Sequence, residues 1–230
     1  MKRAILAVAP LLALSSPALA AEQKFTVTGF ESISVSVPHK VIVATGKAPG
    51  VRAVGDQKSI DRLEVDVASG TLRIREKKSD TWFSWKDGEV LTIYVTTHTL
   101  NNARLAGSGD VAVDRMKGQD VKLSLAGSGD LNVGVVTADR IDVSLAGSGD
   151  MAMTGTCGAA TISIAGSGNI DAPGLKCQSL TGKIAGSGDI TTEVVKHAKL
   201  SIAGSGDIKI LGKPQCEVKT LGSGKVSCGD

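Results

Sequence analysis

Short stretches of this chain alternate between apolar and polar residues with a period of two. In residues 123–125 and 143–145, one serine stands between two apolar residues. Because successive side chains of a strand point to opposite faces, this alternation is typical of β-strands with one buried face. The same alternation marks residues 33–37, 63–67 and 91–95. The hydrophobic pattern therefore predicts an all-β protein.

A recurring turn sequence divides the second half of the chain into units of nearly equal length. Five copies read Ala-Gly-Ser-Gly-Asp, one reads Ala-Gly-Ser-Gly-Asn, and a last, degraded copy reads Leu-Gly-Ser-Gly. The first glycines stand at positions 107, 127, 147, 166, 186, 204 and 222, so the period is 18–20 residues. A flexible Gly/Ser linker is the alternative interpretation, but an apolar residue stands four positions after each of these glycines. Seven copies at this spacing indicate a repeat architecture.

Each unit predicts a short strand, a Gly-Ser-Gly turn, a second strand and a further bend. One such unit cannot bury its apolar face alone, whereas stacked units can, since each lays its aliphatic column on the next. Glycine suits the bends because it tolerates positive φ and close approach of the backbone. The period is not a multiple of six, which counts against a left-handed hexapeptide helix, and crossovers between parallel strands are generally right-handed. We therefore expect a right-handed parallel β-helix with about 18–20 residues per coil.

The first twenty residues have the layout of a secretory signal peptide. Lys2 and Arg3 precede an apolar run over residues 5–14, and small residues precede an expected cut after Ala20. The apolar run is too short to span ~30 Å of hydrocarbon. We therefore expect a periplasmic, surface-located or secreted protein without a transmembrane segment in the mature chain.

The remaining chain is expected to form one continuous domain over residues 22–230. Residues 22–100 would supply irregular N-terminal β coils and a cap, and residues 101–230 would supply the repeat with its C-terminal cap. The whole chain has 26 basic and 23 acidic residues, so loss of the two basic residues of the signal leaves 24 − 23 = +1. A charge this close to neutral gives no strong attraction to nucleic acid, and we expect no such partner.

The four cysteines allow three disulfide pairings, and the repeat register chooses among them. Cys157 and Cys177 each lie nine residues before a turn glycine, which places them in one column on adjacent coils, ~5 Å apart. Cys216 and Cys228 flank the last turn, six residues before and six after Gly222. We therefore predict Cys157–Cys177 and Cys216–Cys228, which an oxidising export compartment permits. A metal site is the alternative, but no CxxC pattern or nearby histidine supports it.

The in-register Gly-Ser-Gly turns, the alternating strands before them and the signal pattern together resemble one known family. This is the "putative auto-transporter adhesin head GIN domain" family, and the similarity covers roughly residues 30 to 225. The resemblance implies a right-handed β-helix in an exported bacterial protein and, from the family's name, a role in adhesion. The family offers no catalytic motif to transfer to this chain.

An acidic residue follows the second glycine of most turns, so stacking would place carboxylates in a column. These residues are Asp110, Asp130, Asp150, Asp189 and Asp207, with Asn169 at the sixth position. Stacked carboxylates ~5 Å apart repel one another unless hydrogen bonds, solvent or cations offset the charge. We expect the side chains to cap N–H groups of the turns, and a cation-binding edge is the alternative.

The chain has only six aromatic residues, and all of them precede residue 95. They are Phe25, Phe30, Trp82, Phe83, Trp85 and Tyr94. Trp82, Phe83 and Trp85 lie close together among charged residues and form the candidate partner-binding patch. The alternative is that these three rings fold back as a hydrophobic lid on the solenoid.

The residues do not indicate an enzyme. The histidines His39, His98 and His197 share no register, and no nucleophile, metalloprotease, P-loop or dinucleotide motif is present. Some β-helices cleave acidic polysaccharides, so a polysaccharide-active enzyme is kept as a lesser alternative. We expect an exported, cofactor-free interaction module that resembles an adhesin head and binds an envelope or cell-surface protein or glycan. The alternative is an envelope structural or stress-related protein without a specific ligand.

Overall fold

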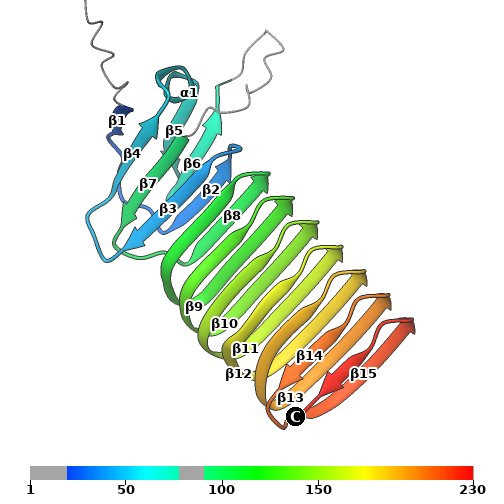
Figure 1. Cartoon of the computed structure of the whole chain (residues 1–230). Coiled ribbons are helices and arrows are strands. Elements are labelled where there is room, and N and C mark those ends of the chain that lie inside the picture. Colours follow the sequence, from blue (N-terminus) through cyan, green and yellow to red (C-terminus); the bar gives the residue numbers. More distant parts are fainter. Residues whose placement is uncertain (1–19, 78–90, 230) are drawn as a thin grey trace, which may run out of the picture.

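The computed structural model describes residues 20–77 and 91–229, which form one 16-stranded sheet wound into a β-solenoid of about six turns (Figure 1). The predicted all-β fold with parallel stacked coils is confirmed. The strands are β1 (Ala21–Phe25), β2 (Ser32–Ser36), β3 (Lys40–Thr45), β4 (Gly50–Gly55), β5 (Leu63–Ala68), β6 (Thr71–Glu76), β7 (Leu91–Thr97), β8 (Asn102–Gly107), β9 (Asp110–Gly127), β10 (Leu131–Gly147), β11 (Met151–Gly166), β12 (Ile170–Gly186), β13 (Ile190–Gly204), β14 (Ile208–Leu211), β15 (Gln215–Gly222) and β16 (Val226–Cys228). In the described ranges the one helix is α1 (Gln57–Asp61), and no helix there is long and apolar enough to cross a membrane.

One sequence repeat corresponds to one coil of the solenoid. Each long strand from β9 to β13 bends around a coil and pairs in parallel with the next. The pairing aligns Gly107 with Gly127, Gly127 with Gly147, and so on to Gly222, so the turn glycines stack along the axis. Register shifts in the bend opposite the turn, for example between Ala172 and Lys176, absorb the variation in repeat length.

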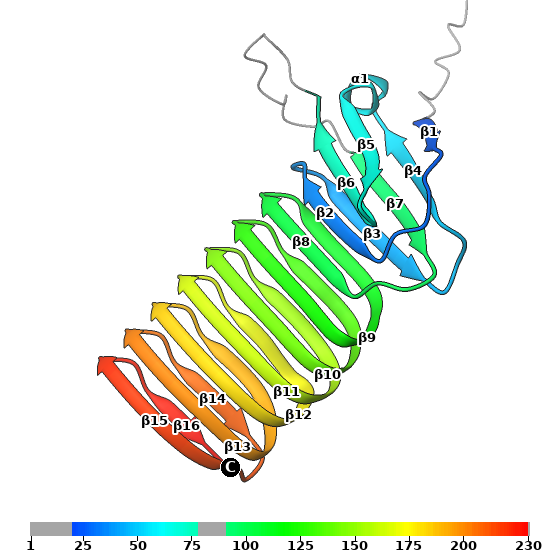
Figure 2. The same cartoon turned by 180° about the vertical axis from the view of Figure 1, so that it is seen from behind.

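Each coil has two walls, which we name by their position relative to the turn. The Asp wall begins at the residue after the Gly-Ser-Gly turn, as in residues 110–113 of β9. The Gly wall ends at the first glycine of the next turn, as in residues 121–127 of β9. Figures 1 and 2 show the stacked coils from two opposite sides. The two walls enclose a lumen filled by side chains.

Stacked aliphatic columns form the core. The residue two positions before each turn glycine is at most 3% exposed in six successive coils. This column consists of Leu105, Leu125, Leu145, Ile164, Ile184 and Ile202. Burial of one such side chain contributes roughly 1.5–3 kcal/mol to stability. The repeat region therefore builds its core without aromatic rings.

The N-terminal region extends both walls with strands of mixed direction. β2 and β3 form a coil that lies between two others, because β2 pairs in parallel with β6 and β8, and β3 with β7 and β9. Beyond these, β5 pairs antiparallel with β6, β4 with β7, and β1 with β4 (Figure 2). Asp56 caps α1, which connects β4 to β5, by accepting a hydrogen bond from the Ser59 N–H (3.1 Å). The solenoid thus continues at this end into one antiparallel extension on each wall.

Candidate functional site

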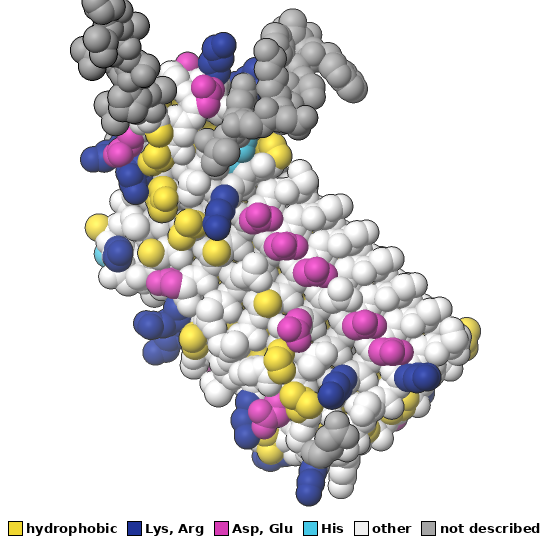
Figure 3. All heavy atoms as spheres, viewed as in Figure 1, with side chains coloured by type: hydrophobic (Ala, Val, Ile, Leu, Met, Phe, Trp, Pro, Cys, Tyr) yellow, Lys and Arg dark blue, Asp and Glu magenta, His cyan; other side chains and the backbone are white. Residues whose placement is uncertain are grey.

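The residues that follow the turns form a ladder along one edge of the solenoid, seen as a row of acidic side chains in Figure 3. Oδ1 of Asp150 accepts a hydrogen bond from the N–H of Asn169, and Oδ1 of Asp207 accepts one from the N–H of Lys225, both at 2.8 Å. Equivalent bonds run from the Asp150 N–H to Asp130 (3.2 Å) and from the Asp207 N–H to Asp189 (2.7 Å). From Asp130 to Asp207, each side chain therefore caps the backbone of the next coil.

Two lysines and one asparagine stand beside the acidic side chains of this ladder. Lys40 lies in register with Asp110 at one end, and Lys225 stands next to Asp207 at the other. Asn169 interrupts the row and donates from Nδ2 to Asp150 (3.0 Å). Within residues 20–77 and 91–229, no group of three or more His, Cys, Asp or Glu side chains is placed to hold a metal ion. The hydrogen bonds give the ladder a structural role.

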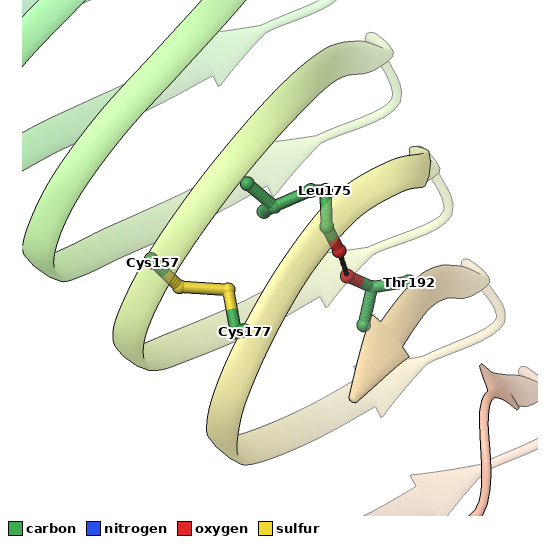
Figure 4. The surroundings of a disulfide bond; sticks show 4 residues. All are labelled: Cys157, Leu175, Cys177 and Thr192. Atoms are coloured by element: carbon green, nitrogen blue, oxygen red, sulfur yellow. Dashed lines mark hydrogen bonds between the residues drawn. A yellow bond between two sulfur atoms is a disulfide. The ribbon is translucent and has the colours of Figure 1, made fainter. Parts of the chain in front are cut away.

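The four cysteines form two disulfides, Cys157–Cys177 and Cys216–Cys228. Figure 4 shows Cys157 and Cys177 on adjacent coils, with Cα atoms 4.5 Å apart, as their common register predicts. Cys216 lies on the Gly wall in β15 and Cys228 on the Asp wall in β16, with Cα atoms 6.6 Å apart. This second bridge therefore crosses the lumen of the last coil.

The aromatic patch proposed from the sequence cannot be placed. Trp82, Phe83 and Trp85 lie outside the described residues, between the end of β6 and the start of β7. Of the other three aromatic residues, Phe30 is buried in the core and Phe25 is partly buried against it. Tyr94 is the most exposed of these three, with 37% of its surface accessible.

Tyr94 lines a groove of about 420 Å³ on the outer face of β3, β4 and β7, where the Asp wall extends toward the N-terminus. The strand register places Tyr94 beside Arg52 of β4 and Ile42 of β3. The residues that characterise this Tyr94 groove are Lys24, Ile42, Ala44, Lys47, Arg52 and Tyr94. Apolar side chains gather over these strands in Figure 3, with basic side chains beside them.

The Tyr94 groove is positively charged. The guanidinium carbon of Arg52 lies 4.5 Å from the centre of the Tyr94 ring, a cation–π contact. Nη1 of Arg52 also donates to Oε2 of Glu22 (3.2 Å). Lys24 and Lys47 have no ion-pair partner among the described residues. Three basic groups against one carboxylate leave the groove able to bind an anion that also has apolar surface.

Sequence reasoning missed this groove because its residues are distant in the chain. Arg52 and Tyr94 meet only through the antiparallel pairing of β4 with β7, and alternation alone does not identify a strand's neighbour. The available signal was Tyr94 itself, at an outward position between the buried residues Ile93 and Val95. An aromatic side chain on the exposed face of a strand is a feature to examine for binding.

A second groove, of about 470 Å³, lies on the outer face of the Gly wall and is lined mostly by residues with polar side chains. Its residues include Ser34, Arg104 and Lys122, and no aromatic residue lines it. Elsewhere on this wall Arg140 donates two hydrogen bonds to Asp120, and these bonds lower the pKa of the Asp120 carboxyl below its usual value. Hydroxyls and ion pairs are the ordinary surface of an exposed strand, so the Tyr94 groove is the stronger candidate.

The histidines do not form a catalytic centre with one another. His39 lies in the turn between β2 and β3, His98 follows β7, and His197 lies in β13 at the other end of the solenoid. The ladder carboxylates from Asp130 to Asp207 accept backbone hydrogen bonds.

Comparison with solved structures identifies the same fold in three bacterial proteins. A putative adhesin from Bacteroides fragilis is 23% identical, with a TM-score of 0.83 over 93% of this chain and 98% of that chain. A putative lipid binding protein from Parabacteroides distasonis is 24% identical, with a TM-score of 0.72 over 91% and 96%. A putative adhesin from Parabacteroides merdae is 20% identical, with a TM-score of 0.70 over 91% and 95%. At these identities the likeness shows the fold alone.

A search of functionally curated proteins found no match to this chain. One family model matches residues 29–214, which include strands β2 to β14 and six of the seven turn copies. The resemblance noted in the sequence is therefore confirmed, and the chain belongs to the family described as "Putative auto-transporter adhesin, head GIN domain".

Proposed function

We propose that this protein is an exported, non-enzymatic interaction module of the cell envelope, with a role like that of an adhesin head. Membership of the adhesin-head family supports a binding role. Two disulfides support a location outside the cytoplasm, because cytosolic thiols are kept reduced. The signal-like segment that ends at Ala20 supports export by the general secretory route.

The observation that carries the binding proposal is the Tyr94 groove. The Tyr94 ring and the aliphatic side chains of Ile42 and Ala44 can contact the apolar face of a sugar ring. Lys24 and Lys47 can pair with carboxylate or sulfate groups on that sugar. We therefore propose an anionic cell-surface glycan as the partner.

Two observations favour binding over catalysis. The separate positions of His39, His98 and His197 leave no histidine pair to share proton transfer. The ladder carboxylates accept hydrogen bonds from the backbone of neighbouring coils. This structural role accounts for their regular spacing, so no catalytic role is needed to explain it.

The test is saturable binding of acidic polysaccharides to the purified protein, expressed from its full sequence and recovered from the periplasm. N-terminal sequencing of this protein is expected to begin at Ala21. Tyr94→Ala and Lys47→Ala are each expected to weaken binding at least about tenfold. Binding is also expected to weaken as salt concentration rises, because the groove pairs with its ligand through exposed charges.

Lys209→Ala is the matched control, since Lys209 is an exposed lysine of the Asp wall in β14, far from the groove. This variant is expected to bind like the unchanged protein. Absence of saturable binding to acidic and neutral polysaccharides would favour an envelope structural protein without a ligand. Equal binding by all three variants would remove the Tyr94 groove from the proposal.

A further inference from the structure

The last coil presents an edge of the sheet to which no described strand is paired. β15 pairs with β13, β16 pairs with β14, and the outer edges of both are free of neighbours among the described residues. The two most exposed large hydrophobic residues of the described chain both lie in β15, Leu221 at 79% and Val218 at 45%. An unpaired edge with apolar side chains is a template for pairing with another strand.

Every second residue of β15 directs its backbone N–H and C=O groups toward this unpaired edge. Along the Gly wall, the carbonyl of each turn glycine faces the following coil; that of Gly204 accepts a hydrogen bond from the N–H of Gly224 (3.2 Å). Gly222 has the same register in the last coil, so its carbonyl faces the open edge. Because alternate residues of a strand point the same way, Val218 and Thr220 also direct their N–H and C=O groups outward.

The exposed side chains of β15 are complementary to those of a second copy. If two β15 strands pair antiparallel with Val218 opposite Val218, Glu217 of each copy faces Lys219 of the other. Opposite charges at facing positions stabilise a strand pair, whereas like charges destabilise it. Centring the pair on Glu217 or on Lys219 would place two carboxylates or two ammonium groups opposite each other. Of these three registers, the charges favour the one centred on Val218, in which the ion pairs of Glu217 with Lys199 (3.4 Å) and Lys219 (3.8 Å) of its own chain gain a further lysine.

The Asp wall can pair in the same arrangement. The Cys216–Cys228 bridge holds these two residues opposite each other across the lumen. Val218 follows Cys216 by two residues, and Val226 precedes Cys228 by two. Val218 and Val226 therefore also lie opposite each other, one step closer to the turn. Val226 shares the register of Ile208, whose N–H donates toward the following coil (2.9 Å). The N–H of Val226 therefore also faces the open edge, and one two-fold axis serves both walls.

We propose that two copies of this chain associate end to end through β15 and β16, as an antiparallel dimer centred on Val218. The two solenoids then share one continuous sheet across the interface. The Tyr94 grooves lie at the two far ends of this dimer, because each belongs to the opposite end of its own solenoid.

The test combines charge reversal with sedimentation equilibrium of the full mature protein. Protein concentrations from about 1 µM to about 1 mM cover the dissociation constants of weak dimers. The unchanged protein is expected to dimerise. Glu217→Lys and Lys219→Glu each place like charges at two facing positions and are expected to weaken the dimer at least about tenfold. The double variant E217K/K219E restores opposite charges and is expected to dimerise again. An equimolar mixture of the two single variants is expected to form heterodimers for the same reason.

Lys183→Glu is the matched control, since Lys183 occupies the column of Lys219 two coils earlier, inside the stack. This variant is expected to dimerise normally. Val218→Pro removes one outward N–H without removing a bond to β13 and is expected to weaken the dimer. A monomeric unchanged protein over the whole concentration range would overturn the proposal. A dimer whose dissociation constant is unchanged in both Glu217→Lys and Lys219→Glu would also overturn it.

Discussion

The turn glycines allow neighbouring coils to approach at backbone contact distance. Gly147 has a φ of 136°, and a Cβ at this position would overlap the carbonyl oxygen of Gly127 in the preceding coil. Gly107 also has a positive φ, 118°, but has open space around the position of a Cβ. Backbone strain and steric overlap can therefore be separated by comparing these two positions.

Replacement of Gly147 by alanine is expected to be more damaging than the same change at Gly107. Gly107→Ala adds a left-handed strain of about 1–2 kcal/mol. Gly147→Ala adds the overlap with the Gly127 backbone as well, for a total loss of at least about 3 kcal/mol. Denaturant unfolding of the two variants measures this difference. Equal losses in unfolding free energy would mean that the positive φ accounts for the requirement for glycine, and that the close approach of the Gly127 backbone adds nothing to it.

The aspartate ladder couples one coil to the next at the level of the strand ends. Oδ1 of Asp150 accepts hydrogen bonds from both the N–H and the Nδ2 of Asn169. Asn169 performs the same acceptor role toward Asp189 with an amide oxygen (3.1 Å). The ladder therefore requires an oxygen acceptor at this position but does not require a negative charge.

Removal of the acceptor is expected to cost more stability than removal of the charge. Asp150→Ala leaves the Asn169 N–H without this partner and is expected to lower the unfolding free energy by about 1–2 kcal/mol. Asp150→Asn keeps an oxygen acceptor and relieves carboxylate repulsion, so its effect is expected to stay within about 0.5 kcal/mol. Thermal unfolding with and without millimolar calcium provides the measurement, and calcium is expected to leave the Tm unchanged. A loss in Asp150→Asn as large as in Asp150→Ala, or a Tm raised by calcium, would contradict this account.

The sequence predicts which strands are neighbours in the repeat region, because the repeat spacing sets their register. It does not predict the strand neighbours in the N-terminal region, which has no repeat. The spacing of the turn glycines fixed the register of every coil from β8 onward, and with it the column shared by Cys157 and Cys177. The alternation in residues 63–67 indicated a strand but could not show that β5 runs antiparallel to β6. The partners of β1 and β4 were hidden for the same reason, since period-two alternation is identical in parallel and antiparallel strands.

Over residues 20–77 and 91–229 the solenoid has nearly one-dimensional connectivity, since strand pairing joins each coil to its immediate neighbours. In such a fold, the free energy of unfolding is approximately the sum of the stabilities of the single coils and of the interfaces between neighbouring coils. A substitution that destabilises one coil therefore affects mainly that coil and its neighbours. Cys157–Cys177 bridges β11 and β12 in the middle of the stack, whereas Cys216–Cys228 closes the last coil. The two disulfides therefore protect different parts of the molecule.

Loss of each disulfide is expected to loosen its own coils only. Replacing Cys216 and Cys228 by serine is expected to speed amide hydrogen exchange in β15 and β16 and to leave β9 and β10 unchanged. The matched variant without Cys157 and Cys177 is expected to speed exchange in β11 and β12. Hydrogen exchange followed by mass spectrometry resolves these regions. A uniform increase along the whole chain in either variant would show that the solenoid unfolds as one unit.

The position of the β2–β3 coil has a consequence for the order of folding. This coil comes first in the chain, yet it lies between the β6–β7 pair and the β8–β9 coil. A chain that emerges N-terminus first cannot complete the stack by adding each new coil to the previous one in a single direction. Strands β5, β6 and β7 must pair on one side of β2 and β3, and the repeat must stack on the other side. The β2–β3 coil is thus the one N-terminal coil with a parallel-paired neighbour on each side, so the finished stack extends from it in both directions.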